Sequence, residues 1–125
     1  MILLDTSAVI LLLRGESPKA VILRETVGLS SVVEMELWLG VFHGGGKKER
    51  RRVESFLESV RIFEFDSQAA ERTARVIADL WFIGKPIGDF DSQIAGHALS
   101  LEMPLLSDNA KHFKRVDGLD LVSWR

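Results

Sequence analysis

The sequence predicts an α/β fold built on a mainly parallel β-sheet with helices on both faces, and three observations support this prediction. Short apolar runs alternate with longer amphipathic segments along most of the chain, which is the pattern of repeated strand–helix units. The length of 125 residues fits one domain of this kind. No internal repeat, low-complexity tract or long linker divides the chain, so we expect a single domain over residues 1–125.

The five expected strands are short apolar or alternating runs that end in turn residues. The first run, Ile2–Leu4, stops at Asp5, and a later run of the same kind stops at Asp108. The third run alternates apolar and polar side chains, as a half-buried strand does. We expect strands at residues 2–4, 28–31, 61–65, 104–107 and 119–124.

The expected helices follow from amphipathic spacing and from residues that start or stop helices. Pro18 suits the first turn of a helix, Gly44–Gly46 stops one, and either Asp66 or Ser67 can cap the longest one. Asp89 can cap the helix after that. Helices are expected at residues 7–13, 18–26, 32–42, 47–60, 67–83, 89–101 and 108–113. The core stripe of the longest helix is expected to be Ala70, Ala74, Ile77 and Trp81.

The composition excludes several classes of protein. The chain has no cysteine, which excludes disulfides, thiolate catalysis and cysteine-based zinc sites and fits a reducing cytoplasm. Residues 2–13 are apolar but contain Asp5 and follow no basic segment, so we do not interpret them as a signal peptide. No stretch is long enough to cross a membrane. We therefore expect a cytoplasmic protein.

Positive charge is concentrated in one short segment. The net charge of −2 gives no general attraction to nucleic acid, but six consecutive residues hold five of the 16 basic side chains. With Glu49 this segment carries +4, which leaves −6 for the rest of the chain. It is either a solvated helix face or a surface that contacts the phosphates of a nucleic acid. Its basic residues are Lys47, Lys48, Arg50, Arg51 and Arg52.

Acidic residues follow two of the expected strands and lie in or at the start of expected helices. In an α/β fold such positions can converge at one edge of the sheet. Converging carboxylates raise one another's pKa values unless a cation compensates, and oxygen-only ligands suit Mg²⁺ or Mn²⁺. The pattern therefore indicates metal-assisted chemistry on a phosphate-containing substrate. The residues are Asp5, Glu36, Asp89, Asp91 and Asp108.

Several of these residues also have a purely structural interpretation. Asp5 is either a ligand or the cap of the next helix, a cap that Thr6 or Ser7 can equally provide. Glu34 and Glu36 are separated by about 200° around a helix, so only one of them can face a given site. The three histidines form no metal-binding motif, and we treat them as ordinary residues: His43, His97 and His112.

Four segments, taken in order, resemble the motifs of the PIN-domain family, and most closely its VapC-type toxins. The likeness extends over nearly the whole chain, and the ordered set is more specific than any one motif. The segments are Ile2–Ser7, Ser31–Gly40, Ile87–Ala95 and Leu106–Phe113.

The resemblance implies the roles of individual residues. Asp5, Glu36 and Asp91 would be catalytic ligands of Mg²⁺ or Mn²⁺, with Glu36 assigned in preference to Glu34. Asp108 would be an ancillary ligand, although the family's fourth acidic position aligns with Asn109. The residues expected around the ligands are Ser7, Asp89, Ser107 and Asn109.

The resemblance also implies an architecture and an activity. The fold would be a three-layer α/β/α arrangement with a five-stranded parallel sheet in the order 3-2-1-4-5. The activity would be metal-dependent endoribonuclease cleavage of tRNA or ribosomal RNA, leaving a 5′-phosphate and a 3′-hydroxyl. The basic segment would position the RNA. A VapB-type antitoxin would lay a helix near Trp38, Leu39 and Phe42, and the toxin would form a homodimer.

Other functions remain as alternatives. A phosphatase of the haloacid-dehalogenase type also begins with an Asp after an apolar strand, but it needs a second Asp where this chain has Ser7. A receiver-type phosphoacceptor domain needs an acid pair near the first strand. A non-catalytic PIN-like module that binds RNA or a partner, or an RNA-processing nuclease without a toxin role, would keep the fold and change the function.

Overall fold

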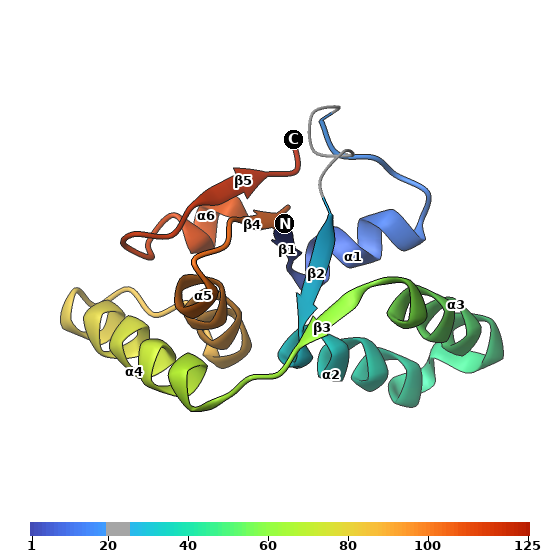
Figure 1. Cartoon of the computed structure of the whole chain (residues 1–125), viewed down its shortest axis with the longest axis horizontal. Helices are drawn as coiled ribbons and strands as arrows, with labels where there is room; N and C mark the ends of the chain where they lie inside the picture. The colour runs from blue at the N-terminus through green and yellow to red at the C-terminus, as the bar shows by residue number, and fades with distance from the viewer. Residues whose placement is uncertain (20–25) are drawn as a thin grey trace.

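The fold is a five-stranded parallel sheet flanked by helices, seen in a computed structural model that describes residues 1–19 and 26–125 (Figure 1). The strand order is β3-β2-β1-β4-β5, and every neighbouring pair is parallel. This confirms the expected fold class and strand order. The strands are β1 (Ile2–Leu4), β2 (Val27–Ser30), β3 (Arg61–Phe63), β4 (Leu105–Ser107) and β5 (Leu121–Ser123), whose ends differ from the expected ones by at most two residues.

The helices connect these strands by parallel crossovers. Figure 1 shows α4 and α5 side by side on one side of the sheet, with α1 and α3 on the other. The helix expected over residues 18–26 falls largely outside the described residues. The helices are α1 (Thr6–Leu13), α2 (Ser31–Gly40), η2 (Val41–Gly45), α3 (Gly46–Ser59), α4 (Ser67–Phe82), α5 (Asp89–Leu101) and α6 (Ala110–Phe113). None of the helices within residues 1–19 and 26–125 has the length and hydropathy that a bilayer crossing requires.

The position of β1 determines where a site can form. β1 pairs with β2 on one side and with β4 on the other, so the chain winds in opposite directions from this point. In open α/β sheets, ligands bind outside the carboxyl ends of the strands where this reversal occurs. Asp5 directly follows β1, and Ser107 is the last residue of β4. The topology therefore places both residues at the switch point of the sheet.

The core stripe that we expected for α4 is wrong by one residue. The buried positions are Ala69, Thr73, Val76 and Leu80, whereas Trp81 is 70% exposed. The two stripes have the same spacing and lie on adjacent faces of the helix. α5 determines which one is buried, because Gly96 has no side chain and lets the backbone at Thr73 come into close contact. Three apolar residues at the end of α4 are left exposed as a consequence: Trp81, Phe82 and Ile83.

A kink separates α2 from α3. The helix expected over residues 32–42 stops at Gly40, and η2 follows with non-helical backbone angles at His43 and Gly44. Gly44 has a φ of +98°, which side chains other than glycine rarely adopt. The kink turns α3 back along α2, so that Arg50 lies over the Trp38 ring at 5.6 Å.

Candidate active site

Asp5 is almost fully buried at the end of β1, with 3% of its surface exposed. Its Oδ1 accepts hydrogen bonds from the Ala8 backbone N–H at 2.9 Å and from the Ser7 hydroxyl at 2.7 Å. Its Oδ2 accepts one from the Ser107 hydroxyl at 2.5 Å. Asp5 therefore is the cap of α1, and neither Thr6 nor Ser7 takes that place. Because capping uses only one carboxylate oxygen, the structural and the functional interpretation of Asp5 are compatible.

Serine hydroxyls join the end of β1 to the end of β4. The Ser7 hydroxyl accepts from the Asp108 N–H at 2.9 Å, and the Ser107 hydroxyl accepts from the Asn109 N–H at 2.8 Å. Each serine thus holds both the Asp5 carboxylate and the turn after β4. This network fixes the turn that carries Asn109 relative to Asp5.

Glu36 approaches the same place from α2. Its Oε1 accepts a hydrogen bond from the Thr6 hydroxyl at 2.7 Å, and the side chain is partly buried. Sequence reasoning considered Thr6 only as a helix cap and missed this contact. Its position next to Asp5, at the first turn of α1, was the available signal.

Asp91 lies in the first turn of α5, close to the turn after β4. Its Oδ2 is 3.4 Å from the Asn109 amide nitrogen and 3.8 Å from Nδ1 of His112. The expected cap at Asp89 is wrong, since the helix is capped at Gly88 without a side-chain hydrogen bond and Asp89 is exposed. Neither Asp89 nor Asp91 therefore caps α5 with its side chain.

His112 is the site neighbour that sequence reasoning missed. We treated all three histidines as ordinary residues, and this holds for His97, which is buried and bonds the Ser30 hydroxyl. His112 instead lies 3.1 Å from the Asn109 amide nitrogen. It follows Asn109 by one helical turn in α6, and this spacing is the signal that would have identified it.

The three carboxylates influence one another electrostatically. Burial raises the pKa of Asp5, hydrogen bonds from Ser107, Ala8 and Ser7 oppose the rise, and the charge of Asp91 adds to it. Burial also raises the pKa of Glu36; the Thr6 hydroxyl opposes this, and the charges of Asp91 and Asp5 add to it. Burial raises the pKa of Asp91 as well, while His112 opposes the rise. Burial is thus the main cause of the raised pKa at all three carboxylates, and the charge of Asp91 reaches both Asp5 and Glu36.

Asp108 has a different environment. Its two carboxylate oxygens face the Arg125 guanidinium, at 2.9 Å from Nε and 3.3 Å from Nη2. The structure therefore pairs Asp108 with a cation at the end of the chain, while its neighbour Asn109 contacts Asp91.

The basic segment covers more than one side of α3. Arg50 binds Glu54 at 2.9 Å and lies over Trp38, facing α2. Arg51 and Arg52 line a pocket of about 520 Å³ together with Leu12 and Leu13 of α1. The five charges therefore do not form one continuous face, and Arg51 and Arg52 are the pair that shares a surface with α1.

An exposed apolar groove lies along α2 and η2. Met35, Leu39 and Phe42 are 44%, 55% and 70% exposed, and they line a pocket of about 470 Å³ with Trp38 and Arg50. The Trp38 and Phe42 rings stack, with their centroids 5.8 Å apart. This is the surface that the sequence suggested for a partner helix.

The donor set fits a hard divalent cation. Asp5, Glu36 and Asp91 offer only oxygen atoms. Burial is the main cause that raises their pKa values, and a cation among them would stabilise the charged carboxylates that burial disfavours. Within residues 1–19 and 26–125, no group of three or more acidic or histidine side chains lies close enough together to hold a metal ion by itself. Mg²⁺ usually keeps several waters and binds through one or two carboxylates together with substrate phosphates, so an open site suits it.

Comparison with known proteins places this arrangement in a family. The PIN domain matches residues 2–119. The tRNA(fMet)-specific endonuclease VapC of Shigella flexneri is 35% identical over 97 residues, which cover 77% of this chain and 74% of that protein. Ribonuclease VapC1 of Rickettsia felis is 32% identical over 127 residues, which cover 98% of this chain and 95% of that protein.

Solved structures show the same fold over its full length. VapBC2 of Rickettsia felis, bound to a DNA fragment from its promoter, has a TM-score of 0.89 and 27% identity, and the likeness covers 100% of both chains. DNA-bound VapBC of Salmonella typhimurium has a TM-score of 0.84 and 29% identity, again over 100% of both chains. This chain belongs to the PIN-domain family, and VapC ribonucleases are among the relatives that it matches.

Proposed function

We propose that this protein is a metal-dependent endoribonuclease that acts as the toxin of a VapBC-type pair. One observation supports this most directly: Asp5, Glu36 and Asp91 come from three separate elements, burial raises the pKa of each, and the charge of Asp91 adds to the rise at both Asp5 and Glu36. Asp108, by contrast, is paired with the cationic side chain of Arg125. The relatives named as VapC ribonucleases supply the reaction class.

In this proposal, Asp5, Glu36 and Asp91 hold Mg²⁺ or Mn²⁺. A bound cation would polarise the scissile phosphate and lower the pKa of the attacking water. Ser7 and Ser107 hold the Asp5 carboxylate, and Thr6 holds the Glu36 carboxylate. Their neutral hydroxyls orient the carboxylates without neutralising them, which preserves the negative charge that a cation needs.

The substrate class is RNA, with tRNA or ribosomal RNA as the proposed targets. One relative is named for cleavage of the initiator tRNA. Attack by water does not need the ribose 2′-hydroxyl, so the products would carry a 5′-phosphate and a 3′-hydroxyl. Arg51 and Arg52 are the residues of the basic segment best placed to hold the RNA backbone, since they share a surface with α1, the helix that Asp5 caps. We place this activity in the cytoplasm, where such RNA is found.

The proposed antitoxin partner binds the apolar groove of α2 and η2. An amphipathic helix presenting apolar residues at one-turn spacing would cover Met35, Leu39 and Phe42. Structures of VapBC complexes are among those that this chain resembles. Arg50 at the margin of the groove would form an ion pair with an acidic residue of such a helix.

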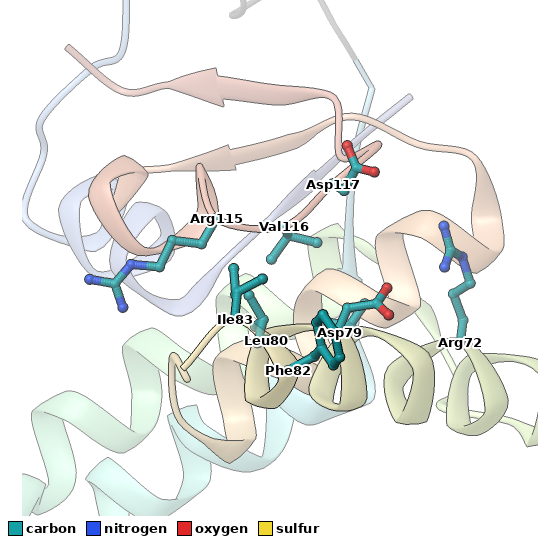
Figure 2. Close-up of a pocket in the computed structure, with 9 residues that line it drawn as sticks. Arg72, Asp79, Leu80, Phe82, Ile83, Arg115, Val116 and Asp117 are labelled. Atoms are coloured by element: carbon teal, nitrogen blue, oxygen red, sulfur yellow. The ribbon is translucent and has the colours of Figure 1, made fainter. Parts of the chain in front are cut away.

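We also propose that two copies pair through the end of α4. Trp81, Phe82 and Ile83 are 70%, 92% and 54% exposed, which is unusual for three consecutive large apolar residues. Figure 2 shows the adjacent pocket of about 380 Å³, with Arg115 at one side, Arg72 at the other, and Asp79 and Asp117 between them. A face that carries both signs of charge around an apolar centre can complement its own copy across a two-fold axis.

The test is cleavage of total cellular RNA by the purified protein in Mg²⁺, in Mn²⁺ and in EDTA, beside an Asp5→Asn variant. Asn still caps α1, so this variant removes the charge and keeps the helix. We expect discrete fragments that need metal and disappear in the variant. If folded, antitoxin-free protein cuts no RNA with either metal, the alternative of a non-catalytic binding module takes its place. Cleavage confined to precursor RNA, without arrest of growth, would favour an RNA-processing nuclease.

A further inference from the structure

Asn109 contacts two side chains of the site with a single atom. Its amide nitrogen lies 3.4 Å from Oδ2 of Asp91 and 3.1 Å from Nδ1 of His112. All three side chains are partly buried, and they come from α5 and from the segment that begins α6. The two hydrogens of the amide group match these two neighbours, since each neighbour offers a lone pair.

The neighbours determine which way the amide points. The opposite orientation would put the carbonyl oxygen of Asn109 against a carboxylate oxygen of Asp91, and two acceptors repel. His112 adds to this preference when its Nδ1 accepts, because that nitrogen also needs a donor. Nδ1 is 3.8 Å from the carboxylate of Asp91, which is too far for a direct hydrogen bond. The charge of the imidazole can reach Asp91 directly across this distance, but the hydrogen-bonded link between the two side chains runs through Asn109.

We propose that Asn109 and His112 form an amide clamp that positions the Asp91 carboxylate, and that Asn109 is not itself a metal ligand. The amide nitrogen has no lone pair available to a cation, and it is the atom that faces Asp91. Asp5 is held by three hydrogen bonds and Glu36 by Thr6, whereas Asn109 is the donor to Asp91. The proposal rests on the proposed function only in taking Asp91 as a ligand.

The clamp gives the charged and the neutral side chains of the site different roles. Three carboxylates carry the charge, and a neutral amide stands where a fourth carboxylate would add to the repulsion. Groups that orient a metal ligand without touching the metal typically change affinity or activity about 10- to 100-fold when they are removed. His112 is thus a positioning residue for Asp91, not a proton donor to the substrate.

The experiment compares Asn109→Ala, His112→Ala, the double variant and His112→Asn, with Lys111→Ala as the control on the exposed face of the same helix. Mn²⁺ affinity is measured by calorimetry on the folded proteins, and kcat and KM on an RNA substrate. We expect each single alanine variant to lose about tenfold in Mn²⁺ affinity and about tenfold in kcat, with KM unchanged. The double variant should lose no more than the more impaired of the two single variants, because both substitutions break the same contact. His112→Asn should recover most of the loss, because its Oδ1 lies near the former Nδ1 and accepts from Asn109.

Additive losses in the double variant would overturn the clamp, and so would a His112→Asn variant as weak as His112→Ala. A further readout needs neither metal nor activity. In metal-free protein, the NMR signal of the Asn109 side-chain amide should shift in both Asp91→Ala and His112→Ala. An unchanged signal would overturn the clamp even in an active enzyme. A shifted signal in a protein that cuts no RNA would support the clamp and reject the proposed function alone.

Discussion

The Ser107 hydroxyl donates a 2.5 Å hydrogen bond to Oδ2 of Asp5, although the two residues are 102 positions apart in the sequence. The bond joins the ends of two adjacent parallel strands, β1 and β4. The hydroxyl donor is neutral, so the bond holds Asp5 in place without adding a positive charge next to its carboxylate. The cost of this buried negative charge should be measurable in the stability of the metal-free protein.

The stability of the metal-free protein should fall as the pH rises above about 4. The folded-state pKa values of Asp5 and Asp91 lie above 3.8 and that of Glu36 above 4.5, so the folded chain keeps protons that the unfolded chain has lost. The unfolded state then binds fewer protons, and the free energy of unfolding decreases with pH through this window. Urea unfolding in EDTA at several pH values, on wild type and Asp5→Asn, measures this contribution.

The advantage of Asp5→Asn over wild type should grow as the pH rises above about 4, the range in which the unfolded Asp5 loses its proton. Adding Mg²⁺ should remove this advantage. Asp66→Asn is the matched control, because Asp66 caps α4 in the same way on an exposed face. A difference between Asp5→Asn and wild type that does not change with pH would contradict a buried, uncompensated charge.

Gly96→Ala should destabilise the protein by about 1–3 kcal/mol or more. A Cβ atom at this position would collide with the hydroxyl and the backbone of Thr73, where α4 and α5 are in contact. Gly40→Ala is the control within a helix, since nothing lies within 4 Å of its added Cβ. It should be neutral or stabilising by up to about 1 kcal/mol. Denaturant unfolding measures the free energy of unfolding of both variants. Equal values for Gly96→Ala and Gly40→Ala would contradict close packing between Gly96 and Thr73.

Phe42→Ala and Phe82→Ala should have opposite consequences for the two proposed interfaces. Both phenylalanines are mainly exposed, so neither variant should lose much stability. Phe42→Ala should weaken antitoxin binding about tenfold or more and leave self-association unchanged, as expected for an aromatic anchor in a groove. Phe82→Ala should do the reverse. Calorimetry with the antitoxin and analytical ultracentrifugation of the toxin alone measure the two effects. One variant impairing both would show that the surfaces are not independent.

Asp108→Asn tests whether Asp108 also serves as an ancillary ligand. Its pairing with Arg125 predicts a small effect, within about threefold on kcat, because an exposed ion pair contributes only about 0–1 kcal/mol. Arg125→Ala should behave in the same way. A large loss of Mn²⁺ affinity in Asp108→Asn but not in Arg125→Ala would restore the expectation that Asp108 is a ligand.

The double variant Arg51→Ala with Arg52→Ala should raise the KM for RNA and leave kcat unchanged. These residues lie near Leu12 and Leu13 at the far end of α1, about 12 Å along the helix from Asp5. At that distance they can hold a phosphate of the backbone without touching the reacting one. The salt dependence of binding should fall by about 0.7 per lost contact for single-stranded RNA. Unchanged KM and salt dependence would favour a solvated helix face.

The strand positions could be predicted because they depend on local patterns, whereas the strand order came from the family resemblance. Apolar runs ending in Asp5 and in Ser107-Asp108 set the strand ends, and the resemblance to a known family ordered them. The α4 stripe could not be predicted in the same way, since two stripes of equal spacing compete. Trp81 and Ile77 are the more apolar choice, yet contact with Gly96 on another helix decides the outcome.

Two neighbours of the carboxylates, Thr6 and His112, were missed for a related reason, whereas Ser7, Ser107 and Asn109 were expected there from the family resemblance. Thr6 contacts a residue 30 positions away, and His112 lies near one 21 positions away. Only the fold brings these pairs together. The choice between cap and ligand for Asp5 also could not be settled from sequence, because one carboxylate oxygen is sufficient for the cap and the two interpretations do not exclude each other.

The strand order has a consequence for how the protein is made. β1 is synthesised first, but its neighbour β4 is the fourth of five strands in the chain, and it brings Ser107 and the turn with Asn109. A ribosome that has not yet translated β4 therefore holds a chain whose Asp5 still lacks Ser107 as its partner. For a nuclease proposed to cut the RNA of the translation machinery, this order delays the assembly of a working site until β4 and the turn after it have been made.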